Sequence, residues 1–301
     1  MHTKPIQVDT VPRCNKLFCR KVLHPLVSLI PLTHSEDART LRTECYCILT
    51  LKLPSSYTGL GRTSCDFTAG TVVLYRPGEV VDLSMLHEYP TSGQLLVFHP
   101  TLIQGTALGS HISSYPFFGY RPQEALHLSS KEQHVLQGCL TDLKKELLWG
   151  IDDFSKPLIC NIIDLLLNYT QRFYVRQFVT RHDAEAPLIV HGRSMLLRYL
   201  HSPLPRRRTM PTISEIAFSL GHAEAYYDSI LRAQTGKSFA EYAKLLRWQL
   251  AQHEIAETDK PFEQIADEMD FPSVNCMSSL MRRLTGKSLQ EIRDKKICPT
   301  S

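Results

Sequence analysis

A short sequence pattern occurs twice in the last third of this chain and limits what that region can fold into. Ile-Ala at residues 216–217 and Thr-Gly-Lys-Ser at 235–238 return as Ile-Ala at 265–266 and Thr-Gly-Lys-Ser at 285–288. The Ile-Ala pairs lie 49 residues apart and the Thr-Gly-Lys-Ser blocks 50 apart, so the second copy holds one extra residue. A self-similarity of this period predicts two copies of one supersecondary unit.

Each copy predicts two short helices joined by a turn. Apolar residues recur at i, i+3, i+4 and i+7 from Ile213 to Leu220 and again from Phe262 to Met269, which is one face of a short helix. After a break, a second apolar stripe runs through residues 227–231 and 277–281. Two short helices around a tight turn form the helix-turn-helix pattern, in which the second helix, the recognition helix, enters a DNA groove.

Residues 239–256 connect the two copies. They contain no Gly or Pro and are rich in residues that favour helices. A helix over this segment would be a rod of roughly 27 Å. We expect such a rod to hold two recognition helices about one DNA turn apart, on the order of 34 Å.

The repeated region resembles a known family. The residues that carry the resemblance are Ile216, Ala217, Thr235, Gly236, Tyr242, Arg247, Ala251, Ile265, Ala266, Phe271, Thr285, Gly286, Glu291, Ile292 and Arg293. They closely resemble the DNA-binding domain of the AraC/XylS family of bacterial transcription regulators, and the one-residue difference in unit length also matches that family. The alternative is a helical solenoid without nucleic acid, but solenoids usually need about three or more repeats.

The resemblance implies contacts with double-stranded DNA from the free face of each recognition helix. The expected residues are Ala225, Tyr226, Ser229 and Arg232 in the first copy and Ser273, Asn275, Ser278, Ser279, Arg282 and Arg283 in the second. Asp228 places a negative charge in the first recognition helix, where phosphates would repel it. We therefore expect the second recognition helix to contribute more.

Three departures from the family pattern leave a second interpretation open. Ser229 and Ser279 stand where the family often has Arg, and Asp270 stands where the turn usually has Gly. The chain can therefore also be interpreted as a protein-interaction module whose helix-turn-helix units no longer bind DNA.

The first hundred residues have the pattern of a small β-domain. Short runs rich in branched and aromatic residues, bounded by turn signals, predict strands at 26–30, 45–53, 71–75, 80–84 and 94–98. Many short strands indicate a sandwich or barrel. The corner at Leu74–Gly78 is similar to the cupin-type barrel of many of these regulators. Residues 95–129 and 172–178 resemble the regulators of this type common in Bacteroidetes-like bacteria.

Two helices are expected after the strands, at Ser129–Trp149, with a capping box at Ser130–Gln133, and at Pro157–Phe178. The second carries a broad apolar stripe that includes Ile162, Ile163, Leu166 and Tyr169. Packing against the barrel is one interpretation of this stripe. We favour a homodimer interface, as the family resemblance implies, because the stripe is wide for a helix lying on a small barrel.

Composition bounds the function without deciding it. The chain has 301 residues, of which 43% are hydrophobic and 21% charged, as in ordinary soluble proteins of about two domains. We find no apolar run long enough for a membrane span and no secretory signal, so a cytoplasmic location is expected. The net charge of +4 does not by itself indicate DNA. Arg206–Arg208, the densest basic cluster, lies between prolines and is better interpreted as a linker.

Nothing in the sequence indicates catalysis, a metal or a cofactor. Metal-binding cupins carry clustered His ligands, but this chain has no His-x-His pair, and His87, His99 and His111 are isolated. The nine cysteines fit no zinc spacing; Cys45 and Cys47 share one face of a strand and are expected to be buried thiols. A cupin-type metalloenzyme with a helical appendage remains the alternative from another class.

The sequence therefore predicts an α+β transcription regulator of three parts. A cupin-like sensor barrel spans residues 1–125, a helical dimerisation segment 126–182, and an all-α domain of two helix-turn-helix units joined by a linker helix 186–297. Its expected partners are operator DNA, a second copy of the chain, a small-molecule effector and RNA polymerase. The residues that would bind an effector, the operator sequence and the direction of regulation are not determined by the sequence.

Overall fold

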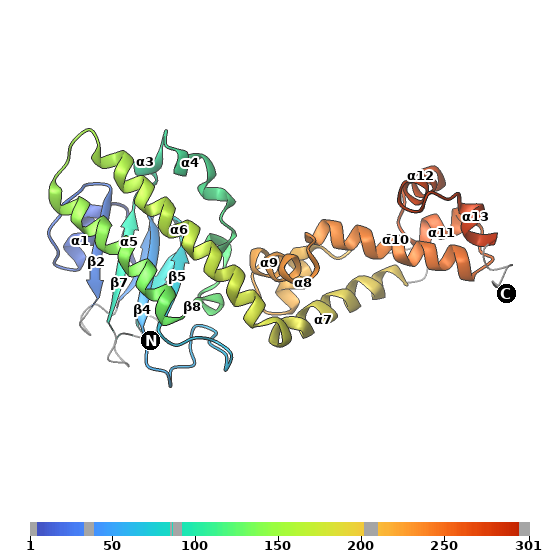
Figure 1. Cartoon of the computed structure of the whole chain (residues 1–301), viewed down its shortest axis with the longest axis horizontal. Coiled ribbons are helices and arrows are strands. Elements are labelled where there is room, and N and C mark those ends of the chain that lie inside the picture. The colour runs from blue at the N-terminus through green and yellow to red at the C-terminus, as the bar shows by residue number, and fades with distance from the viewer. Residues whose placement is uncertain (1–4, 33–38, 85, 87–91, 202–209, 295–301) are drawn as a thin grey trace. The chain divides into compact units, whose positions relative to one another are not determined.

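The computed structural model describes residues 5–32, 39–84, 86, 92–201 and 210–294 (Figure 1). The chain divides into two compact units. The first unit consists of Met1–Asp183 together with His222–Tyr226, and the second of Ala184–Gly221 and Tyr227–Ser301. The expected linker at Arg206–Arg208, the isolated His87 and the expected domain end at residue 297 lie outside the described residues.

The strands of the first unit form two sheets. The five-stranded sheet is antiparallel and has the order β2 (Val27–Leu32), β7 (Ser92–Phe98), β4 (Tyr46–Lys52), β5 (Gly70–Tyr75) and β8 (Leu126–Leu128). The smaller sheet has the order β1 (Ile6–Val8), β3 (Thr40–Thr43) and β6 (Val80–Asp82). In the larger sheet Leu49 pairs with both Val73 and Leu95, so its central strands place apolar side chains side by side.

The expected cupin-like barrel is not closed among the described residues. Among the described residues, β3 pairs only with β1 and β6, so the smaller sheet does not join the edge strands β2 and β8 of the larger one. The two sheets instead enclose a common apolar core. Leu41 and Val81 of the smaller sheet lie in it with Ile30, Leu49 and Leu95 of the larger one.

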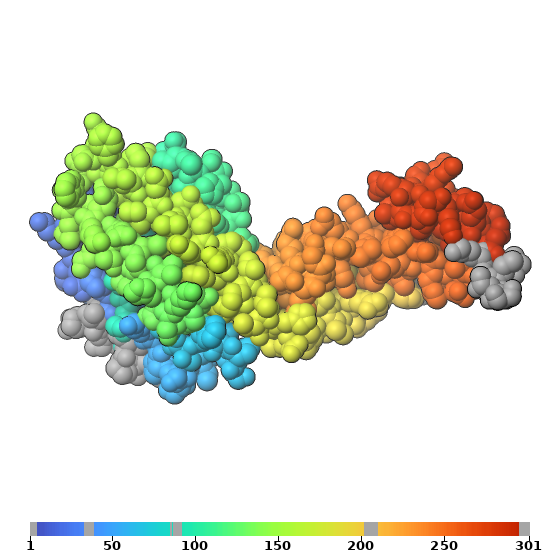
Figure 2. All heavy atoms as spheres, in the orientation of Figure 1, coloured from blue at the N-terminus to red at the C-terminus, as the bar shows by residue number. Residues whose placement is uncertain are grey.

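Two long helices, α5 (Ser130–Trp149) and α6 (Ser155–Thr180), pack against each other and cover the larger sheet. Figure 2 shows their side chains forming the surface of this unit on the face in view. The capping box of α5 is made by Ser129 and Glu132, one residue before the expected one, because Ser129 is the residue with extended backbone. Shorter helices are α1 (Val11–Leu17), α3 (Pro100–Ile103) and α4 (Ala107–His111).

The apolar stripe of α6 faces its own unit. Ile163 and Leu166 are buried, whereas Ile162 and Tyr169 are half-buried. Packing within the first unit therefore explains why Ile163 and Leu166 are apolar, because neither side chain lies on a free surface. The homodimer interface stays a prediction.

The second unit is helical. Most of α7 (His182–Leu200) belongs to it, followed by α8 (Ile213–Ser219), α9 (Glu224–Thr235), α10 (Phe239–Glu257), α11 (Phe262–Glu268), α12 (Val274–Thr285) and α13 (Leu289–Asp294). The predicted helix pairs α8–α9 and α11–α12 and the linker helix α10 are confirmed. Helix α7 packs closely on the first pair, since a Cβ atom on Gly192 would meet Tyr227 and Ile216. No helix within the described ranges is long and apolar enough to cross a membrane.

Candidate nucleic-acid interface

The repeated Thr-Gly-Lys-Ser block ends one helix and begins the next. Gly236 and Gly286 adopt left-handed backbone angles, with φ of +70° and +74°, which a glycine adopts without steric cost. Their N–H groups donate to the carbonyls of Arg232 and Arg282, at 2.8 and 2.9 Å, and so close the last turn of each recognition helix. The glycine in each copy therefore sets the end of a recognition helix.

The serine of the same block caps the following helix. Ser238 and Glu241 exchange two hydrogen bonds at the start of α10, and Ser288 and Glu291 do so at the start of α13. The serine hydroxyl and backbone N–H that donate to each carboxylate lower the pKa of both glutamates, because these bonds stabilise the ionised form. The tetrapeptide thus fixes the chain direction at the same point of both units.

The turn of the second helix-turn-helix unit is held by the linker helix. Asp270 takes a left-handed conformation with φ of +59°, equivalent to Gly221 in the first turn with φ of +75°. Arg247 of α10 donates from Nη1 to the Asp270 carbonyl at 3.0 Å, and its guanidinium lies 4.8 Å from the centre of the Phe271 ring. This contact fixes a turn that contains aspartate in place of glycine.

Helix α12 is strongly two-sided. Met277 and Met281 point into a core shared with Ile265, Phe271 and Ile292. The opposite face exposes Asn275, Ser279, Arg282 and Arg283, which follow an i, i+4, i+7, i+8 spacing. Ser273 caps the helix by accepting from the Cys276 N–H at 3.2 Å, and Ser278 is half-buried. Four of the six predicted residues of this copy therefore share one exposed face.

The arginines of the two recognition helices differ in their partners. Within the described part of the chain, neither Arg282 nor Arg283 makes a side-chain hydrogen bond or ion pair, although Arg282 lies near enough to Glu291 to lower its pKa. In contrast, Arg232 Nε donates to Asp228 at 2.7 Å. The other oxygen of Asp228 accepts from the Phe239 N–H at 2.8 Å. Asp228 therefore neutralises Arg232 and also anchors the start of α10.

The first turn of α9 lies in the first unit, not in the second. Tyr226 is 1% exposed, and its hydroxyl accepts from Arg181 Nη1 at 3.0 Å. Ala225 is half-buried, and a Cβ atom added to Gly119 would lie 3.1 Å from its methyl group. Tyr226 has to leave this position before it can contact DNA.

A family model described as a helix-turn-helix domain matches residues 216–295, a range that begins within α8 and includes α9, the linker helix, the second helix pair and α13. These residues form an AraC-type helix-turn-helix domain. The Bacteroidetes-like subtype stays a prediction. A search of curated proteins finds no match to the chain.

The solved structures that are similar to this chain include the following two. A transcriptional regulator with an AraC-type DNA-binding domain from Chromobacterium violaceum is 20% identical, covering 39% of this chain and 99% of its own, with a TM-score of 0.34. ToxT from Vibrio cholerae, in its form bound to an unsaturated fatty acid, is 13% identical, covering 89% of this chain and 94% of its own, with a TM-score of 0.29.

Sequence patterns missed the structural roles of Asp228 and Tyr226 in the AraC-type domain. The Asp228 hydrogen bond to Phe239 spans 11 residues, and the Arg181 bond to Tyr226 spans 45. The pattern of polar residues along one helix cannot predict contacts with residues so far away in the sequence. The one available signal was Arg181 itself, an arginine three residues after the predicted apolar helix Pro157–Phe178.

Among the described residues, the cysteines and histidines considered for a redox or metal site are buried or hydrogen-bonded within the first unit. Cys45 and Cys47 are buried in the core between the sheets, and burial raises the pKa of both thiols. His111 lies 2.9 Å from Asp164 of α6, and His99 caps α3. Across the described residues, no three His, Cys, Asp or Glu side chains gather as metal ligands would.

Proposed function

We propose that this chain is a sequence-specific DNA-binding transcription regulator in which α12 makes most of the base contacts. The observation that supports this proposal is the exposed face of α12, with Asn275, Ser279, Arg282 and Arg283 beside one another. Asn pairs with adenine and Arg with guanine or phosphate, so this face offers groups for both base and backbone contacts.

The length and the attachments of the linker helix support binding of the two recognition helices to two neighbouring DNA grooves. Helix α10 has 19 residues and is about 28 Å long. It is hydrogen-bonded to the first helix pair through Phe239 and Asp228, and to the second through Arg247 and Asp270. A rod attached at both positions sets the distance between the two recognition helices. Such a fixed distance is needed if the two helices are to enter the major groove on the same side of the DNA, one helical turn apart.

The test compares Arg282→Ala with Arg232→Ala in the full-length protein. If Arg282 contacts a base, its loss should cost about 1–3 kcal/mol and relax the preference at one position. If it contacts phosphate, affinity should fall evenly and the salt slope should shrink by about one. Arg232→Ala should have the smaller effect, because Asp228 already neutralises that arginine.

The measurement is a salt titration of binding to matched and scrambled duplexes. Arg13→Ala serves as the control, since Arg13 is exposed in the first unit and its ion pair among the described residues is an i, i+4 contact with Asp9. A greater loss for Arg232→Ala than for Arg282→Ala would contradict the assignment of the main contacts to α12.

The division of labour follows the expected domains. Residues 186–297 bind DNA, 126–182 mediate dimerisation and 1–125 sense an effector. A cleft of about 250 Å³ between the larger sheet and α5 supplies room for a small molecule. It is lined by Leu136 and Leu140 together with Gln94, Gln133 and Gln137. Leu140→Trp should fill this cleft and abolish any effector response without changing basal DNA binding.

Dimerisation is tested at Ile162, a half-buried residue of α6. Ile162→Glu should shift the full-length protein from dimer to monomer in sedimentation, because a charge would be buried in the interface. Val175→Glu is the matched control, since Val175 is 52% exposed and lies elsewhere around the same helix. Wild-type protein that sediments as a monomer at micromolar concentration would contradict the proposal.

A second candidate function is a protein-interaction module without DNA binding. It is favoured by the first recognition helix, where Tyr226 is buried and Arg232 is paired with Asp228. Failure of the full-length protein to retain any duplex would favour this candidate. Under the main proposal the protein acts in the cytoplasm, and RNA polymerase is a further partner.

A further inference from the structure

We infer that the first unit restrains the AraC-type domain by holding the first turn of α9, through Glu124 and Arg181, in a state that excludes DNA from this turn. This inference rests on the proposed function, because it concerns how DNA binding is limited. The first-turn contact is the set of interactions that Glu124 and Arg181 make with residues 222–226.

Glu124 forms the first half of this contact. Its side chain is 2% exposed. Oε1 accepts from the Ala223 N–H at 2.8 Å and lies 3.0 Å from Nδ1 of His222, while Oε2 accepts from the Arg121 N–H at 2.7 Å. A buried carboxylate is costly unless it is hydrogen-bonded, and negative charge is favourable at the start of a helix. Glu124 therefore loses two of its hydrogen-bond partners when residues 222–226 leave.

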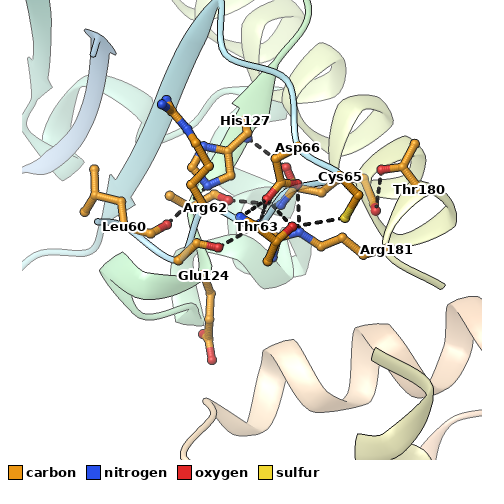
Figure 3. A network of polar contacts seen from close by, with 12 residues as sticks. Leu60, Arg62, Thr63, Cys65, Asp66, Glu124, His127, Thr180 and Arg181 are labelled. Carbon is orange, nitrogen blue, oxygen red and sulfur yellow. Dashed lines mark hydrogen bonds and ion pairs between the residues drawn. The ribbon is translucent and has the colours of Figure 1, made fainter. Parts of the chain in front are cut away.

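Arg181 forms the second half, at the end of α6 (Figure 3). Its side chain is 5% exposed and pairs with Asp66, whose side chain is fully buried. Two hydrogen bonds of 2.9 and 2.6 Å join them, and Arg181 also donates to the Gly61 carbonyl at 3.1 Å. Burial raises the pKa of Asp66, but the bonds and charge of Arg181, together with two hydrogen bonds from Thr63, outweigh it, and the pKa is lowered overall. Arg181 is thus held in place while its Nη1 binds Tyr226.

Aromatic packing completes the contact. The Tyr226 ring meets Tyr120 edge-on at 5.1 Å, lies 5.5 Å from Phe178 and stacks on His222 at 5.4 Å. A side chain enclosed in this way cannot touch a base or a phosphate at the same time. The first turn of α9 therefore has two mutually exclusive states, one packed in the first unit and one free for DNA.

Because α9 is one continuous helix from Glu224 to Thr235, its start cannot be held without restraining the rest. If the restrained state is populated about ten times more than the free state, apparent DNA affinity falls about tenfold. A substitution at Glu124 that weakens the first-turn contact should recover this affinity. Glu124 is not part of the DNA-binding face, so the gain would come from releasing the first turn of α9.

The test is Glu124→Gln in the full-length protein, with Glu132→Gln as the matched control. Both glutamates cap a local helix through a backbone N–H, and both substitutions remove one negative charge. Glu132 pairs with Arg176 of α6 rather than with residues 222–226. Two measurements are made: hydrogen exchange of residues 222–227 without DNA, and affinity for a duplex selected from random sequences by the wild-type protein.

The expected result is faster exchange at 222–227 and about tenfold tighter DNA binding for Glu124→Gln, with neither change for Glu132→Gln. Tyr226→Phe, which removes the bond to Arg181, should also speed exchange, whereas Tyr115→Phe, which removes a bond to Asp164, should not. Unchanged exchange, or faster exchange with unchanged affinity, would overturn the inference. If no protein selects any duplex, the proposed function fails, while the exchange data still decide whether the first-turn contact exists.

Discussion

At the scale of single residues, His127 lies in the same buried network as Arg181 and is fully enclosed. Its Nε2 lies 3.2 Å from the Leu60 carbonyl and its Nδ1 3.3 Å from the Thr71 hydroxyl, which itself accepts from Arg62. Nε2 must carry the proton to donate to a carbonyl, so Nδ1 accepts from Thr71. The pKa of His127 is lowered to about 4, mainly by burial and with help from the charges of Arg181 and Arg62, against the opposing effect of Asp66.

This low pKa predicts a pH dependence of stability. An unfolded histidine has a pKa of 6.5, so between pH 6.5 and about 4 the unfolded state binds more protons than the folded state. Stability is therefore full above pH 6.5 and falls as the pH drops toward 4, by roughly 3 kcal/mol in total. His127→Gln should flatten the profile in this range when unfolding by urea is measured from pH 7.5 to 4.5. His134→Gln, at an exposed position of α5, should keep the wild-type slope.

At the scale of helices and strands, the caps of the repeated block are the most testable element. Ser288→Ala should destabilise the second helix-turn-helix unit by about 1 kcal/mol, because Ser288 accepts from the Glu291 N–H. The lowered pKa of Glu291 gives stability that is full above its unfolded value of 4.5 and is lost as pH falls through the lower folded value. Glu291→Gln should remove this acid-dependent part, as followed by circular dichroism. Equal acid sensitivity of wild type and Glu291→Gln would contradict the assignment.

The same scale shows why some elements were predicted from sequence and others were not. The helices of the AraC-type domain follow from periodicity and from caps within four residues, so the exposed face of α12 could be predicted. Strands β1 and β8 have three residues each, too few to show an alternating pattern. Helix α7 contains Pro187, which breaks the usual helical signal. The state of Tyr226 depends on Arg181 and Tyr120, which are far away in sequence.

At the scale of the whole molecule, the second unit is expected to fold alone. A fragment of residues 184–301 contains both helix pairs, the linker helix and a complete apolar core around Met277 and Met281. We expect it to be soluble and helical by circular dichroism and to bind the duplex that the full-length protein selects. It lacks Glu124 and Arg181, so its residues 222–227 should exchange as fast as those of Glu124→Gln. A folded fragment with no affinity for that duplex would contradict the assignment of DNA binding to this unit.

Since residues 224–226 belong to the first unit by their contacts and to α9 by their sequence, the border between the units falls inside a helix and not in a loop. This matters for anyone who builds hybrid regulators. Joining residues 1–183 to the helix-turn-helix domain of another protein would leave Glu124 without its partners and expose Phe178 and Tyr120 to water. A working hybrid needs residues His222–Tyr226 of this chain in place of the matching segment of the other protein. Alternatively, the recognition helix of the other protein must already carry an equivalent tyrosine.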